Sequence, residues 1–67
     1  MPRKIRDLIK DLRGAGFIRD RQKGSHRQFK HPSGGGVVPI SGAKGDDAKH
    51  YQEKQVAKAI ETSRRNR

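Results

Sequence analysis

The hydrophobic residues of this chain change periodicity twice, from helical to strand-like and back, and this pattern restricts the fold more than any other feature. Near the start they lie at positions 5, 8, 9 and 12, which is the spacing of one helical face and predicts a helix over residues 3–13. Gly14-Ala15-Gly16 follows with the glycines that commonly end a helix and allow a turn. The chain must then reverse direction.

Three short strands are predicted in the middle of the chain. Residues 17–22 and 26–31 form the first two, separated by Lys23-Gly24-Ser25, a connection of hairpin length that contains a glycine. After a loop over residues 32–36, residues 37–40 form the third strand. Because Pro39 cannot donate to a strand ladder, we expect this strand at an edge of the sheet.

Helical spacing returns after residue 47 and predicts a second helix, with Asp46 or Asp47 as its N-cap. The residues at this spacing are Ala48, Tyr51, Gln52, Gln55, Val56, Ala59 and Ile60. Residues 63–67 contain no apolar side chain and predict a frayed basic tail at the C-terminal end.

These elements predict an α+β domain in the order helix, three strands, helix. Two amphipathic helices need a common apolar surface, and one face of a three-stranded antiparallel sheet provides it while the other face stays open to solvent. The order matches the double-stranded-RNA-binding-domain (dsRBD) architecture, and 67 residues allow a single domain, 1–67. The expected core comprises Ile5, Leu8, Ile9, Leu12, Phe17, Ile18, Phe29, Val37, Val38, Ile40, Tyr51, Val56 and Ile60.

The charge of the chain predicts a polyanionic partner. Seventeen Lys and Arg against seven Asp and Glu give a net charge of +10, and nucleic acid suits such a surface because each phosphate contact releases counterions. An acidic protein is an alternative that composition leaves open. A membrane surface would call for Trp or Phe on a basic amphipathic helix, which is absent. Without cysteine or a long apolar run, we expect a cytoplasmic protein that neither spans nor binds a membrane.

The stretch from Arg21 to Pro32 holds the residues best suited to chemistry. If Phe29 points into the core, strand alternation sends His26, Gln28 and Lys30 to the open face. An imidazole exchanges a proton near neutral pH, so it can take the proton of a ribose 2′-hydroxyl, which then attacks the adjacent phosphate while nearby cations stabilise the developing charge. We therefore predict His26 as catalytic and the following residues as RNA-binding: Arg21, Lys23, Ser25, Arg27, Gln28 and Lys30.

Other roles are less well supported by the pattern. Taken alone, His26 is clearly better explained as a polar residue of a surface hairpin that has no function. His31 fits the end of a strand and His50 the wet face of the second helix. The histidines lack a paired spacing and no cysteine is present, so we predict neither a metal nor another cofactor.

Several short motifs together resemble the HicA family of bacterial toxins, over about residues 5–60. The matching elements are Asp7-Leu8-Ile9, Gly16-Phe17, Lys23-Gly24-Ser25-His26, Phe29-Lys30-His31-Pro32 and Val38-Pro39. The resemblance implies the same order of elements, a metal-independent endoribonuclease that cuts mRNA and inhibits translation, and a catalytic role for His26. It also implies an acidic antitoxin partner, HicB, that covers the active face.

One region departs from this family. Many members carry a histidine soon after the third strand and begin the last helix with Pro-Gly-Thr-Leu, whereas residues 41–51 here differ. The departure fits a variant subfamily, a loss of toxicity or a changed substrate. The leading hypothesis is an endoribonuclease toxin that uses His26, and the alternative is a non-catalytic RNA-binding module of dsRBD-like fold.

Overall fold

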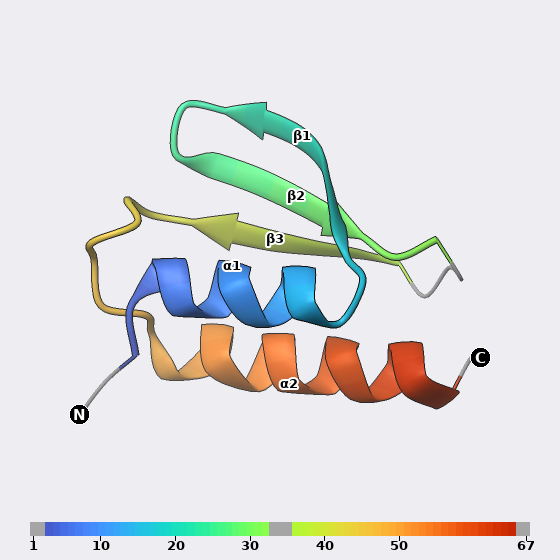
Figure 1. The fold of residues 1–67 in the computed structure, drawn as a ribbon. Coiled ribbons are helices and arrows are strands. Elements are labelled where there is room, and N and C mark those ends of the chain that lie inside the picture. Colours follow the sequence, from blue (N-terminus) through green and yellow to red (C-terminus); the bar gives the residue numbers. More distant parts are fainter. Residues whose placement is uncertain (1–2, 33–35, 66–67) are drawn as a thin grey trace.

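Two helices lie on one side of a three-stranded antiparallel sheet (Figure 1). The computed structural model describes residues 3–32 and 36–65. The sheet order β1-β2-β3 makes β2 the central strand, so the predicted α+β fold is confirmed. The elements are α1 (Ile5–Gly14), β1 (Ile18–Lys23), β2 (His26–Lys30), β3 (Val37–Ser41) and α2 (His50–Arg65).

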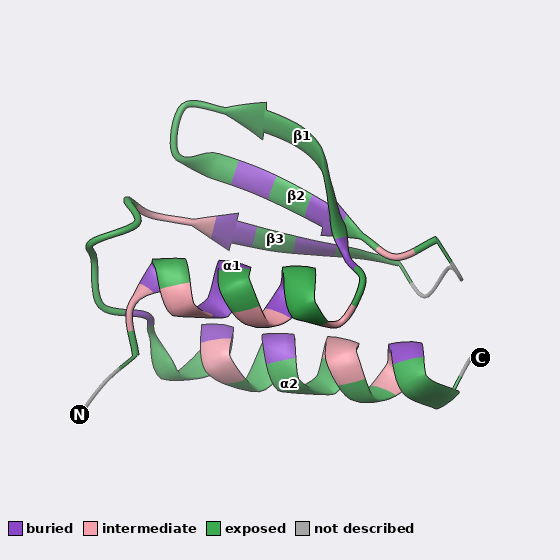
Figure 2. Cartoon of the chain, in the orientation of Figure 1, coloured by how far each residue is buried: buried purple, intermediate pink, exposed green. Residues whose placement is uncertain are grey.

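The two faces of the sheet differ sharply in burial, and the alternation is visible along β2 and β3 (Figure 2). Phe29 pairs with Arg19 of β1 and Val38 of β3, and this row faces the helices. The neighbouring residues of each strand face solvent because side chains alternate along a strand. Pro39 lies in β3 at an edge of the sheet, as predicted.

The core lies between the inner face of the sheet and the helices. Leu8 and Leu12 of α1 are fully buried, as is Phe29 at the centre of β2. The helices run side by side in the same direction (Figure 1). The buried hydrophobic residues are Ile5, Leu8, Ile9, Leu12, Phe17, Phe29, Val38, Ile40, Ala48 and Val56, with Ala15, Ala59 and Ile60 partly buried against them.

Three residues predicted in the core are exposed. Ile18 and Val37 are 54% and 49% exposed because both pair with Lys30, on the outer face of the sheet. Tyr51 is 59% exposed, since the buried positions of α2 are Gln52, Val56 and Ser63. Tyr51 therefore lies about 100° from Gln52 on the helix, outside the stripe that faces the core.

The start of α2 is stabilised by a different side chain from the one predicted. The Lys49 N–H, just before the helix, donates to Oε1 of Gln52 at 2.8 Å. Asp46 instead accepts the Ala43 N–H, and Asp47 pairs with Lys4. The prediction of an aspartate cap is wrong, because Asp46 bonds within the connection between β3 and α2 and Asp47 pairs with Lys4 beside α1.

Helix α2 also extends further than predicted. The helix continues through Arg65, and Ser63 is buried with its hydroxyl donating to the Ile60 carbonyl at 2.7 Å. The frayed tail expected over residues 63–67 is therefore wrong for residues 63–65, and Asn66 and Arg67 lie outside the described residues. Among the described residues, no helix is long and apolar enough to cross a bilayer.

The connection between β3 and α2 is fixed against the start of α1. The Ile5 N–H donates to the Asp46 carbonyl at 2.9 Å, and the Arg6 N–H donates to the Lys44 carbonyl at 3.1 Å. These bonds satisfy two of the amide donors that a helix leaves free at its N-terminal end. They also hold Lys44 beside the first turn of α1.

The inner and outer faces make a testable difference for the same substitution. We expect Ile40→Val, in the core, to lower the free energy of unfolding by about 0.5–1.5 kcal/mol through the lost methylene and the cavity it leaves. Ile18→Val removes the same group from the exposed face and should change it by less than about 0.5 kcal/mol. Urea denaturation followed by circular dichroism measures both. Equal losses would contradict the assignment of the two faces.

Candidate active site

His26 is the first residue of β2, and its side chain lies on the exposed outer face of the sheet. It pairs with Lys23 of β1 on one side and with Ser41 of β3 on the other. Cβ atoms of directly opposed residues in antiparallel strands are about 4.5–5.5 Å apart. Lys23 and Ser41 are therefore the direct cross-strand neighbours of His26 on the outer face.

A bulge in β1 decides which of its cations reach His26. The register shifts by one residue between Arg19 and Arg21, so Arg19 pairs with Phe29 while Arg21 pairs with Gln28. Without this extra residue, positions 19, 21 and 23 would all share one face, because strand side chains alternate. The bulge at Asp20 therefore lets Arg21 and Lys23 share the face of His26 while Arg19 lies on the inner face.

These residues surround a shallow hollow on the outer face. It is lined by Arg21, Gln22, Lys23, His26 and Gln28, none of which is acidic. Three of the residues predicted to bind RNA are thus brought together with His26, namely Arg21, Lys23 and Gln28. The hollow combines a group that can exchange a proton with two cations, and it is open to solvent.

Two other predicted RNA-binding residues lie near this hollow but outside its lining. Ser25 is exposed in the turn between β1 and β2. Lys30 shares the outer face with His26, but four residues of strand separate their Cα atoms by about 13 Å. The Lys30 ammonium lies 3.8 Å from the carboxylate of Asp20, so this cation is already paired.

Arg27 is not brought together with His26. It lies on the inner face, is only 8% exposed, and donates to the Gly42 carbonyl at 3.0 Å and the Ser25 carbonyl at 3.4 Å. These bonds tie the start of β2 to the turn before it and to the connection after β3. The guanidinium therefore stabilises the backbone around the hollow from the inner face of the sheet.

The other two histidines occupy different environments. His31 follows β2, with Nε2 3.1 Å from the Ala15 carbonyl oxygen and its ring edge-on to Phe17 at a centroid distance of 5.0 Å. A Cβ at Gly16, where φ is +96°, would lie 2.9 Å from the same Nε2, so glycine is required at this close approach. His50 is exposed at the start of α2. Neither histidine lies in the hollow.

Within residues 3–32 and 36–65, no three His, Cys, Asp or Glu side chains gather in a group that could hold an ion. The side chains that line the hollow supply one imidazole, two amides and two cations.

Comparison with known protein families decides the relationship of the chain. The model of the family described as the HicA toxin of bacterial toxin-antitoxin systems matches residues 5–61. The chain belongs to the HicA toxin family. The match covers most of the chain, from the first residue of α1 to Glu61 in α2, and includes all three strands. The comparison with curated proteins gave no match. HicA toxins belong to toxin–antitoxin systems, so an antitoxin partner is implied.

Two residues at the site of this HicA-family toxin were not predicted from the sequence. Ser41 flanks His26 only because β3 pairs in one particular register with β2. Gln22 lines the hollow although it pairs with Arg27 of the inner face, because β1 is an edge strand. Alternation from Val38 and Ile40 places Ser41 on the outer face, but the sequence does not show which residue of β2 it meets.

The positions of Arg27 and Arg21 lead us to expect different losses of stability when each is replaced by alanine. Arg27→Ala should lower the free energy of unfolding by about 1.5–3 kcal/mol, the usual loss for hydrogen bonds to a charged group. Arg21→Ala, on the exposed face, should change it by less than about 0.5 kcal/mol. Chemical denaturation of both variants measures this. If Arg27→Ala were as stable as Arg21→Ala, the structural role of Arg27 would be wrong.

Proposed function

We propose that this HicA-family toxin is a metal-independent endoribonuclease that cleaves mRNA in the bacterial cytoplasm and so inhibits translation. The observation that carries the proposal is the exposed His26 in a hollow lined by Arg21, Lys23, Gln22 and Gln28, with no carboxylate among them. Exposure leaves the imidazole of His26 without a role in packing, whereas His31 contacts Ala15 and Phe17.

The proposed reaction begins with removal of a proton. His26 takes the proton of a ribose 2′-hydroxyl, and that oxygen forms a bond to the adjacent phosphorus. The bond from phosphorus to the 5′-oxygen breaks, and this oxygen leaves as a hydroxyl after taking a proton from solvent, to which the hollow is open. His26 then returns its proton to solvent. The products are a 2′,3′-cyclic phosphate end and a 5′-hydroxyl end, so atoms and protons balance without a cofactor.

The neighbours of His26 have distinct proposed roles. Arg21 and Lys23 attract the phosphodiester and stabilise the charge that develops on it, an effect that is strong when donors are already in place. Gln28 and the Ser25 turn bind the RNA beside the reacting nucleotide. Lys30 lies further along the same face. It binds the RNA strand where that strand leaves the hollow, and its ion pair with Asp20 breaks when it does so.

Arg27 supports binding indirectly in this proposal. Its guanidinium donates to the Ser25 carbonyl from the inner face of the sheet, and Ser25 comes directly before His26. Loss of Arg27 would therefore weaken RNA binding by loosening the turn. This differs from the direct phosphate contact that the sequence suggested for Arg27.

The second hypothesis, a module that only binds RNA, shares the cations but not the role of His26. We expect His26→Ala to abolish cleavage while leaving the fold intact, because general acid–base catalysis contributes roughly 10²–10⁴ in rate. His50→Ala is the matched control, since His50 is exposed far from the hollow in sequence and position. The measurement is cleavage of RNA by pure protein with a chelator present, with each fold checked by circular dichroism.

The outcomes separate the hypotheses clearly. Wild type and His50→Ala should cut at the same rate. A folded His26→Ala protein that also cuts at that rate would refute the catalytic assignment. A wild-type protein that binds RNA without cutting it would favour the binding module.

The antitoxin partner is proposed to be an acidic, HicB-like protein that covers the outer face. That face carries Arg21 and Lys23 together with the exposed hydrophobic side chains of Ile18 and Val37. Charge complementarity would speed association, and the apolar pair would be buried in the complex. Such a partner would close the hollow and block access of RNA to His26.

This arrangement predicts a specific loss of complex formation. Ile18→Asp should prevent copurification with the coexpressed antitoxin, because it places a carboxylate on the covered face. Tyr51→Asp is the control, since Tyr51 is equally exposed on α2. Copurification and inhibition of RNA cleavage measure the effect. If Tyr51→Asp alone disrupted the complex, the antitoxin would bind the helices instead.

A further inference from the structure

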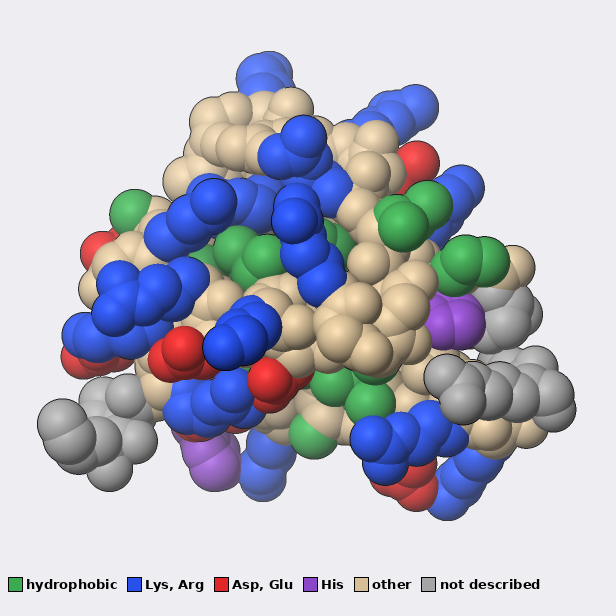
Figure 3. All heavy atoms as spheres, viewed as in Figure 1, with side chains coloured by type: hydrophobic (Ala, Val, Ile, Leu, Met, Phe, Trp, Pro, Cys, Tyr) green, Lys and Arg blue, Asp and Glu red, His purple; other side chains and the backbone are tan. Residues whose placement is uncertain are grey.

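A second cationic depression lies on the other side of the sheet from His26, between α1 and β1. This groove has a volume of about 380 Å³, and Ile9 and Phe29 contribute apolar lining. Figure 3 shows Lys and Arg side chains gathered around a hydrophobic patch on this face. The cations that line the groove are Arg6, Lys10, Arg13, Arg19, Arg27 and Lys44.

The groove exists because the helices leave β1 uncovered. All six residues of β1 are exposed, and the helices lie closest to β3, at the other edge of the sheet (Figure 1). Arg6, Lys10 and Arg13 are spaced four and three residues apart, so they share the face of α1 that borders this gap. The bulge that sends Arg21 outward leaves Arg19 on the inner face, at the opposite wall.

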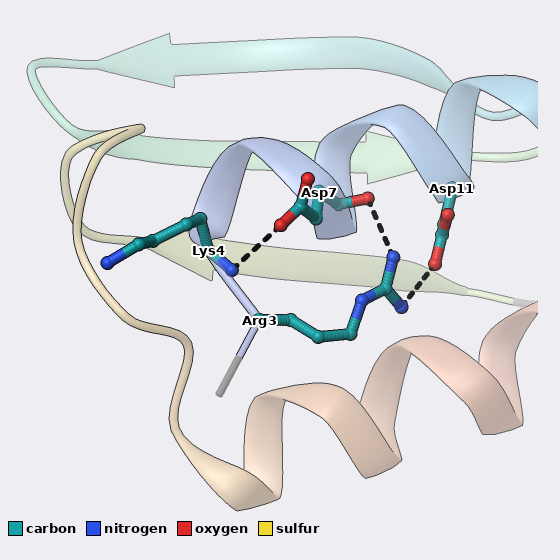
Figure 4. Close-up of polar contacts among 4 residues, drawn as sticks. All are labelled: Arg3, Lys4, Asp7 and Asp11. Atoms are coloured by element: carbon teal, nitrogen blue, oxygen red, sulfur yellow. Dashed lines mark hydrogen bonds and ion pairs between the residues drawn. The ribbon is translucent and has the colours of Figure 1, made fainter. Parts of the chain in front are cut away.

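The acidic residues of α1 do not neutralise these cations. Asp7 accepts the Lys4 N–H at 3.0 Å, and Asp11 forms an ion pair with Arg3 at 2.5 Å (Figure 4). The hydrogen bond to Asp11 raises the pKa of Arg3 above its ordinary value. Both carboxylates are thus used on a different side of the helix from the groove, whose lining contains none.

The groove cations are therefore available to an anion. Within the described residues, the side chains of Arg6, Lys10, Arg13 and Lys44 form no ion pair, unlike those of Arg3 and Lys30. Like charges held around one depression repel one another, and a bound polyanion would relieve that repulsion. One guanidinium group can also donate two parallel hydrogen bonds to a phosphate, which favours a phosphate ligand.

We propose that this groove binds the phosphodiester backbone of the single-stranded RNA whose neighbouring nucleotides occupy the His26 hollow. The proposal rests on the proposed function and extends it with a second binding surface. Gln22 lines both the hollow and the groove, and its Oε1 accepts a hydrogen bond from Arg19 at 2.6 Å. One RNA strand can therefore cross the free edge of β1 at Gln22 and contact cations on both sides.

RNA fits this arrangement better than a protein partner does. The two cationic surfaces form a continuous path only around the narrow edge of a single strand, β1. A flexible polyanion can follow such an edge, whereas a folded antitoxin that covers the outer face would have to wrap around it. Except for the buried Arg27, the groove cations are exposed to solvent, which suits a chain of phosphates.

The test compares two variants that lose the same charge. The groove variant carries Arg6→Gln, Lys10→Gln and Arg13→Gln, and the control carries Lys54→Gln, Lys58→Gln and Arg64→Gln on the exposed part of α2. Glutamine is a good helix former, so both should fold. Affinity for a single-stranded RNA of about a dozen nucleotides is measured at several salt concentrations, with His26→Ala in both proteins to prevent cleavage.

The groove variant should bind at least about tenfold more weakly than the control at low salt. Its plot of log affinity against log salt should be less steep by about 2, since each lost phosphate contact on a single strand contributes about 0.7. Equal affinities and slopes for the two variants would overturn the proposal. If the triple variant does not fold, the same salt dependence is measured with Lys10→Gln alone, which should lower the slope by about 0.7.

Cleavage by proteins that retain His26 separates this proposal from the proposed function. A trinucleotide, which fills only the hollow, should be cut equally by wild type and the groove variant, while the longer RNA should show a raised KM with the variant. If wild type cuts nothing, the proposed function fails, but the binding comparison still tests the groove. If the groove variant loses the antitoxin complex and binds RNA like the control, the groove is a protein-binding surface and the proposal is wrong.

Discussion

Burial of Phe29 at the centre of β2 is the constraint on which both faces of the sheet depend. Its ring is fully buried against the helices, and this orientation sends His26, Gln28 and Lys30 to the opposite, solvent-exposed face. A shift of one residue in register would exchange the two faces and place an imidazole in the core. The packing of one aromatic side chain therefore determines whether the candidate catalytic group reaches solvent.

The bulge in β1 adds a second, independent constraint. Because the register shifts at Asp20, one strand supplies Arg19 to the inner side and Arg21 and Lys23 to the outer side. An edge strand exposed on both faces risks pairing with other chains, and charged residues reduce that risk. In this toxin the same charges also create cationic surfaces on both sides of β1.

Sequence patterns predicted the fold and the orientation of His26, because the helical stripes and the strand alternation from Phe29 both follow from burial. The same alternation places Arg27 inward, and grouping it with the RNA-binding residues by charge alone missed that orientation. Arg19 and Arg21 lie on opposite faces because of the bulge, which no local sequence pattern showed. Tyr51 was misplaced because the stripe of α2 follows Gln52, a polar residue whose side chain donates to the Ser41 carbonyl and accepts the Lys49 N–H.

The central claim is that His26 activates the 2′-hydroxyl of the RNA itself. The most direct measurement is cleavage by pure wild-type protein of a short RNA that it cuts at one site, compared with the same oligonucleotide carrying 2′-deoxyribose immediately 5′ to that bond. Product ends are identified by mass spectrometry. The account predicts a 2′,3′-cyclic phosphate from the RNA and no cleavage at the modified bond. Cleavage of that bond at the rate of the unmodified RNA would show that the nucleophile is not the ribose hydroxyl and would contradict the proposed role of His26.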